Sequence, residues 1–176
     1  MKTYHLKSSE QESLQKWWEW LQSKPGHRAR LRRAKSPDDI LITEEFFHFL
    51  QRMPAKWAEP GRVQDSAMVA AALAKVESTN SKISFAQALA TPPEGRSKAP
   101  VSELRFQQLQ KSHSPEDFFR RLCRALALVK GQANVASLAD SILHWNAEHR
   151  FGADKKPSKR LAVNWATDYY SALPKS

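Results

Sequence analysis

The most chemically distinctive part of the sequence is a group of cations between residues 24 and 35. This segment reads KPGHRARLRRAK and contains no acidic residue. On a helix, Arg28 and Arg32 stand four positions apart and Arg30 and Arg33 three apart, so their charges repel unless an anion lies between them. A guanidinium group can hold two phosphate oxygens at once. We therefore predict that Arg28, Arg30, Arg32, Arg33 and Lys35 contact the phosphates of a polyanion.

A second group of cations is predicted farther along the chain. On a helix from Ser114 to Lys130, one face is apolar and three arginines point away from most of it. Cations of the preceding helix and loop extend the same surface. Because binding to a phosphate backbone strengthens with the number of charges neutralised, we interpret these cations as a collective contact surface. The predicted contact residues are Lys98, Arg105, Lys111, Arg120, Arg121 and Arg124, with Arg96 nearby.

Both groups also have simpler interpretations. The first is equally the pattern of a solvated basic face, or of arginines paired with acids such as Asp38 and Asp39. Each cation of the second group, taken alone, is typical of an ordinary surface. A third group lies in a connection that we expect to be flexible, where solvation and nucleic-acid contact are both open. It comprises Arg150, Lys155, Lys156, Lys159 and Arg160.

Residues that could perform catalysis do not gather in any recognisable motif. His144 and His149 are five positions apart and fall on different helical faces, unlike a metal-binding pair four apart. Cys123 lies in an apolar helical pattern, which indicates a buried structural thiol. No zinc-binding cysteine pair, phosphate-binding glycine loop or nucleophile elbow occurs. We therefore expect no catalytic residue, no metal and no cofactor.

The charge balance supports a polyanionic partner. The chain has 28 Lys and Arg against 18 Asp and Glu, a formal net charge of +10. Nucleic acid is the usual partner of such a surplus, and an anionic membrane surface is the rival. No apolar signal sequence occurs, and no apolar run reaches the roughly 18 residues that span a bilayer. With one cysteine in 176 residues, these features predict a cytoplasmic protein that does not enter a membrane.

Hydrophobic spacing predicts an all-α fold: a compact bundle of roughly eight helices with little or no β-sheet. We expect one domain over residues 1–176, divisible into lobes 1–90 and 101–176 joined by the proline-rich loop 91–100. The expected helix starts include a capping box at Ser9, N-caps at Thr43, Ser114 and Asn134, and a brief helical piece over 84–90. Prolines are expected in the first turn of two further helices, a long one over 60–78 and the last one from residue 157.

Several segments in order resemble the CasB-type small subunit of the type I-E CRISPR Cascade surveillance complex. A tryptophan-bearing first helix runs into ARLRRAKSPDD and is followed by an aromatic helix ending in LQRMP. SFAQALA, VSELRFQQLQKS and a basic-aromatic helix come next. The similarity spans roughly Ser13 to Trp145, and beyond Trp145 the sequence departs from the family pattern.

This resemblance implies an all-α, non-catalytic subunit present in two copies within a crRNA-guided complex. It implies contacts with the backbone subunits, the large subunit, the crRNA and the target and displaced DNA strands. Arg32 and Arg33 match the paired basic residues of the family after its first helix. Arg105 matches an arginine before an apolar stretch, and Lys111 falls where a basic residue is usual.

Three other classes of protein remain open on sequence grounds. A free-standing DNA- or RNA-binding regulator would use the basic second helix for groove recognition and would show sequence preference by itself. A nuclease would require converging carboxylates and a divalent metal. A scaffold would bind an acidic protein through the basic face. By contrast, a Cascade subunit predicts salt-sensitive binding that ignores sequence.

Overall fold

Most helices begin where a side chain accepts one of the first free backbone N–H groups. The computed structural model describes residues 3–175. The predicted N-caps Thr43, Ser114 and Asn134 are confirmed, and Ser84 and Ser102 cap two more helices. The described α-helices are α1 (Ser8–Gln22), α2 (Pro25–Arg32), α3 (Glu44–Arg52), α4 (Val63–Leu73), α5 (Phe85–Ala90), α6 (Glu103–Gln110), α7 (Pro115–Leu128), α8 (Val135–Phe151) and α9 (Leu161–Ala172). The 3₁₀ helices are η1 (Pro37–Ile40), η2 (Ala55–Ala58) and η3 (Pro157–Lys159).

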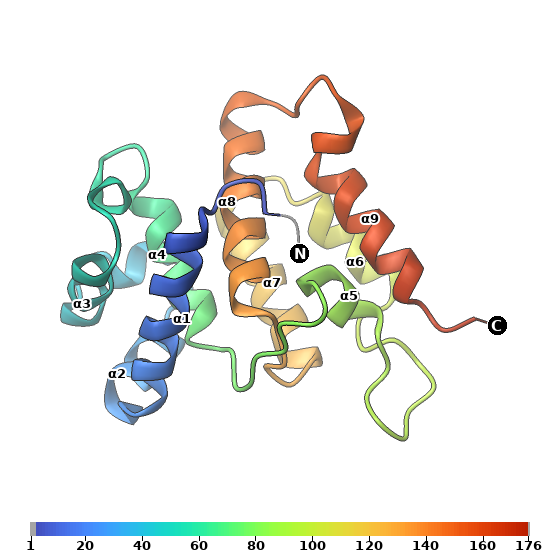
Figure 1. Ribbon diagram of the computed structural model, residues 1–176, viewed down its shortest axis with the longest axis horizontal. Coiled ribbons are helices and arrows are strands. Elements are labelled where there is room, and N and C mark those ends of the chain that lie inside the picture. Colours follow the sequence, from blue (N-terminus) through green and yellow to red (C-terminus); the bar gives the residue numbers. More distant parts are fainter. Residues whose placement is uncertain (1–2, 176) are drawn as a thin grey trace.

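The helices pack around α8, which stands in the middle of the molecule (Figure 1). Helices α1 to α4 lie on one side of α8, and α5, α6 and α9 lie on the other, with α7 behind. Helix α4 packs on α8 and α5 packs on α9, so residues on both sides of loop 91–100 share one core. The prediction of an all-α fold is confirmed: residues 3–175 contain no sheet, and their only bridge pairs Ser78 with Gln132.

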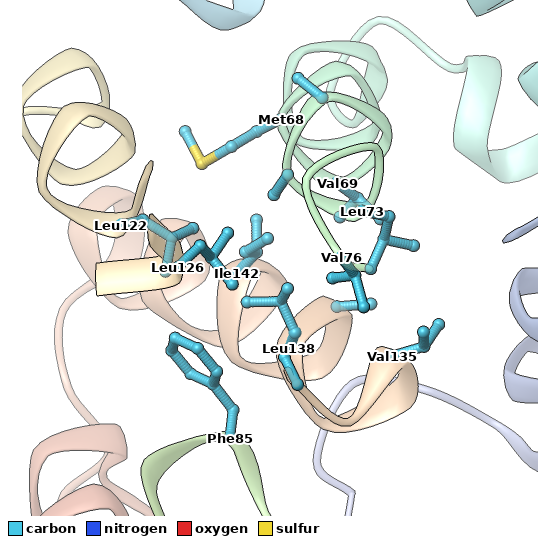
Figure 2. Close-up of a cluster of buried hydrophobic side chains, with 14 of the residues drawn as sticks. Met68, Val69, Leu73, Val76, Phe85, Leu122, Leu126, Val135, Leu138 and Ile142 are labelled. Carbon is cyan, nitrogen blue, oxygen red and sulfur yellow. The ribbon is translucent and has the colours of Figure 1, made fainter. Parts of the chain in front are cut away.

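Hydrophobic side chains from four helices fill the centre of the core (Figure 2). Met68 of α4 points toward Leu122 of α7, Ile142 comes from α8, and Phe85 closes the cluster from α5. The alanines at 70–72 are fully buried, so α4 passes through the core at this point. Burial of these apolar side chains away from water is the main favourable contribution to folding.

Three predicted helix boundaries are wrong. Helix α1 starts at Ser8 rather than after Ser9, because the Glu10 carboxylate accepts the backbone N–H of Lys7. Helix α4 covers 63–73 rather than 60–78, because residues 77 and 78 hydrogen-bond instead with the segment around Gly131. Pro157 opens the short η3 helix, and α9 begins four residues later at Leu161. The backbone N–H of Leu161 donates to the Glu148 carboxylate of α8, so at all three boundaries a hydrogen bond outside the regular helical pattern sets the position.

The contact between residues 77–78 and 131–133 depends on a glycine. Gly131 has a φ of +70° and its carbonyl accepts the N–H of Glu77 at 2.8 Å. A Cβ added at residue 131 would lie 2.5 Å from the Glu77 Cγ and 2.8 Å from the Lys75 carbonyl oxygen. Only glycine fits this conformation at this distance, so Gly131 fixes the position of Glu77.

The N-terminal segment is held by a buried carboxylate of α8. The Asp140 side chain accepts the backbone N–H groups of Tyr4, His5 and Leu6, the shortest at 2.7 Å. The His5 ring also packs against the buried His144 ring at 4.8 Å between centroids. The N-terminal segment is therefore attached to α8 by hydrogen bonds to Asp140 and by packing of His5 on His144.

We predict that stability falls in mild acid because of His5. Burial lowers the pKa of His5 below its ordinary 6.5, and the nearby charges of His144 and Arg62 lower it further, against Asp140 and Glu148. The unfolded chain therefore binds this proton first, so the free energy of unfolding decreases as the pH falls below 6.5. Urea unfolding between about pH 7 and pH 5.5 measures the slope of the free energy of unfolding against pH. His5→Phe should make the slope shallower, and an unchanged slope would show that His5 is not its source.

Candidate nucleic-acid interface

Arg28 of α2 is committed to the fold. Its guanidinium group donates to the carbonyls of Ala74 and Val76 and forms an ion pair with Glu77 at 2.9 Å. Its side chain is only 17% exposed. Arg28 therefore closes the carbonyl end of α4 and anchors α2 against it, rather than facing outward.

The anion expected between Arg28 and Arg32 is a carboxylate of the protein. Glu77 pairs with both guanidinium groups, at 2.9 Å and 3.0 Å. The hydrogen bond from Arg28 keeps the pKa of Glu77 below its usual value, and the charge of Arg32 adds to this. Repulsion within α2 is therefore relieved without a bound ligand.

Arg30 is likewise paired inside the protein, with the buried Glu45 of α3 at 2.6 Å. Burial opposes ionisation of Glu45, but its backbone hydrogen bond and Arg30 outweigh burial, so the pKa of Glu45 is lowered. The partners of these arginines are thus Glu45 and Glu77, not Asp38 and Asp39. Asp39 instead accepts the N–H groups of residues 35 and 36 at the start of η1.

The end of α2 presents the cations that remain available. Arg33 and Lys35 are exposed and form no ion pair within residues 3–175. Arg32 is about half exposed beside them, with one side engaged by Glu77. We call Arg32, Arg33 and Lys35 the α2 cluster. These three cations can approach phosphates without giving up contacts that hold the core.

Four of the predicted arginines line one cleft between α6 and α7. The cleft has a volume of about 510 Å³, and Arg105, Arg120, Arg121 and Arg124 stand around it. Apolar side chains form its floor. We call it the α6–α7 cleft, and its other lining residues are Val101, Gln108, Leu109, Ala125, Ala127 and Leu128.

Two of the cleft arginines are positioned by Asp117. Its carboxylate receives hydrogen bonds from Arg120 and Arg121, and Arg121 also donates to the Gln108 carbonyl on α6. The His113 backbone N–H, followed by these arginines, holds the pKa of Asp117 low against the effect of burial. By contrast, Arg105 and Arg124 are exposed and form no ion pair in the described part of the chain. The cleft thus combines two oriented cations with two available ones.

The remaining predicted cations lie outside these two sites. Lys98 is exposed in the projecting loop 91–100, and Lys111 is exposed just after α6. In the third group, Arg150 forms a bidentate pair with the buried Asp65, and Arg160 donates to two loop carbonyls. Its three lysines are exposed.

Lys75 was missed by sequence reasoning. Its Nζ donates to the Arg32 carbonyl at 2.8 Å, and its charge acts on the Cys123 thiol of α7. Lys75 therefore lies between the α2 cluster and α7. No sequence signal marks it, because it follows α4 by two residues and approaches α7 only in the folded chain.

Burial and ring contacts define the environments of Cys123 and Trp20. Cys123 is partly rather than fully buried, and burial raises the pKa of its thiol to about 11, which disfavours the thiolate form that acts as a nucleophile. Trp20 is half-buried, and the Arg52 guanidinium lies 4.4 Å above its ring. The rings of His27 and His48 also pack on Trp20.

Within residues 3–175, no group of three or more His, Cys, Asp or Glu side chains is placed to hold a metal ion. Over the same range, no helix has both the length and the apolarity required to cross a bilayer.

The fold and these sites define a small all-helical protein with cations displayed on helix ends and around a cleft. Its sequence matches the family model described as CRISPR-associated protein Cse2 over residues 27–170. The match covers most of the chain, so the protein belongs to the Cse2 family, the CasB-type small subunit of type I-E Cascade. It is therefore a subunit of a CRISPR Cascade complex.

The family match corrects the range of the resemblance. The resemblance in the sequence spans roughly Ser13 to Trp145, whereas the family match begins at residue 27 and continues to residue 170. It therefore leaves out α1 and includes η3 and most of α9. A search of curated proteins found no match. A search of solved structures also found none.

Proposed function

We propose that this chain is a non-catalytic subunit that stabilises the crRNA–target DNA heteroduplex and the displaced strand through backbone contacts. It would act in two copies, beside the backbone and large subunits of Cascade. The observation that carries the proposal is the exposure of Arg33, Lys35, Arg105 and Arg124, whose side chains form no ion pair in the described part of the chain. Such cations gain most from phosphates, because no internal ion pair must first break.

Backbone contacts of this kind are sufficient to change the outcome of target binding. The heteroduplex that forms is about as stable as the DNA duplex it replaces, so R-loop formation is close to balanced. A few additional phosphate contacts then decide whether the loop persists. Guide pairing supplies the sequence specificity, and this subunit has no need to contact base edges.

Binding of the full-length chain to DNA fragments of different sequence tests this proposal. Affinities should agree across sequences and fall steeply with added salt. A free-standing regulator with a recognition helix would show strong sequence preference instead. The pairing within α2 argues against that alternative. Arg28 is only 17% exposed and is held by Glu77, and Arg30, although 63% exposed, would have to give up its ion pair with the buried Glu45 to enter a groove.

We also predict that Glu77→Gln strengthens nucleic-acid binding. The substitution removes a negative charge and releases Arg32, while Arg28 keeps its hydrogen bonds to the carbonyls of Ala74 and Val76. The salt dependence should steepen by about one counterion, with a few-fold gain in affinity at low salt. Glu94→Gln is the matched control, because this exposed loop acid forms no ion pair within residues 3–175. Equal gains in both variants would show a net-charge effect rather than release of Arg32.

A further inference from the structure

The α6–α7 cleft has a chemical character that differs from the α2 cluster. Its rim is made of four arginines, but its floor is apolar and comes from Leu109, Ala125 and Leu128. Leu128 is 37% exposed, so part of this apolar lining is open to solvent. Phosphate contact alone requires no apolar surface, so the floor needs a different explanation.

The arginines supply two kinds of contact around this floor. Arg121 is fixed by Asp117 and the Gln108 carbonyl, so its guanidinium plane has a defined orientation. Arg105 and Arg124 are exposed and free of ion pairs in the described chain, so their charges are available to an anion. Guanidinium planes stack on nucleobases, and guanidinium forks hold phosphates. The cleft therefore offers both a surface for a flat apolar ring and charges for the attached phosphates.

A duplex and a single strand differ in what they present to such a cleft. In a duplex the base faces are stacked inside and only phosphates and groove edges reach a protein side chain. In a single strand the base faces can separate and lie on apolar or aromatic surfaces. The volume of about 510 Å³ is within the range of cavities that hold small organic ligands.

We propose that the α6–α7 cleft binds an unstacked base of a single-stranded nucleic acid, with Arg105 and Arg124 on the flanking phosphates. This inference rests on the proposed function and deepens it, since it assigns the cleft to a single strand and leaves sequence-blind duplex contacts to the α2 cluster. An acidic protein segment would satisfy the two available charges but would not require a floor suited to a flat ring.

The test compares two single strands that differ only in their bases. Oligothymidine and an abasic oligonucleotide of the same length carry the same phosphates, and fluorescence anisotropy gives their affinities for the full-length chain. We expect oligothymidine to bind roughly tenfold more tightly, the effect of stacking one base. Ala127→Leu fills the cleft from the exposed end of α7 without changing charge. It should abolish the tenfold preference and leave the abasic affinity unchanged.

Two further variants make the result decisive. Ala55→Leu places the same side chain on η2, away from the cleft, and should keep the tenfold preference. Leu128→Ser removes apolar floor without filling the cleft, so it should also lose the preference even if Ala127→Leu does not fold.

The outcomes separate this inference from the proposed function. Equal binding of both oligonucleotides by the unmodified chain would overturn the base site and leave the phosphate contacts standing. Absence of binding to either would contradict the proposed function itself. Polyglutamate that displaces oligothymidine from the unmodified chain but not from Ala127→Leu would assign the cleft to an acidic protein segment instead.

Discussion

Replacing Arg33, Lys35, Arg105 and Arg124 together with alanine should reduce nucleic-acid affinity on the order of a hundredfold at low salt. Each of these cations is exposed and without an ion pair in the described chain, so each can neutralise a phosphate. Affinity falls with added salt, and losing four phosphate contacts should reduce the magnitude of the slope of log affinity against log salt by about 3. Titrations at several salt concentrations measure both quantities, and the loss should be uniform across sequences.

A charge-matched variant is required, because removal of any four cations weakens long-range attraction. Lys7, Lys16, Lys82 and Lys175 are exposed and lie outside the α2 cluster and the α6–α7 cleft. Their replacement with alanine removes the same total charge and should leave most of the affinity and slope intact. If the two quadruple variants behave alike, the surplus charge acts as a whole and the assignment of contact residues is wrong.

Gly131→Ala should lower the free energy of unfolding by about 3 kcal/mol. The positive φ alone costs a residue with a Cβ about 1 kcal/mol, and the added Cβ would lie within 3 Å of two backbone atoms. For a chain of this length, that loss corresponds to a fall in Tm of roughly 6–12 °C. Calorimetry or urea unfolding measures it.

Gly95→Ala separates the two contributions to this effect. Gly95 has a φ of +75°, close to that of Gly131, but no atom would lie within 4 Å of its added Cβ. Its substitution should therefore cost only the backbone strain, about 1 kcal/mol. Similar losses at both positions would mean that the contact between Gly131 and Glu77 contributes little. Because Glu77 pairs with Arg28 and Arg32, Gly131→Ala should also disturb the α2 cluster.

Helix identity and most helix starts were predictable from local sequence. Ser114 with Pro115 and two first-turn acids marks α7, and Asn134 marks α8, because capping depends on residues within one turn. The end of α4 was not predictable, since it depends on Gly131, which is more than fifty residues away. Local patterns therefore located the elements, and tertiary contacts decided where some of them stop.

The candidate site was predictable as a set of cations but not as an arrangement. Clustering of arginines is visible in the sequence, and four of them do meet in the α6–α7 cleft. Which cations are paired and which are available depends on Glu45 and Glu77. Both lie far from α2 in the sequence, so local sequence patterns do not predict that they pair with its arginines. Arg28 is less exposed than Arg30 or Arg32 because it holds α2 and α4 together, a contact between residues far apart in the sequence.

The most direct test of the account is the lifetime of the R-loop formed by Cascade assembled with the Arg33, Lys35, Arg105 and Arg124 quadruple variant. We expect the variant to enter the complex, since its core is unchanged. R-loops should then dissociate faster than with the unmodified subunit, to the same degree on different targets, and the difference should shrink as salt increases. An R-loop lifetime equal to that of the unmodified complex at low salt, with the variant fully incorporated, would contradict it.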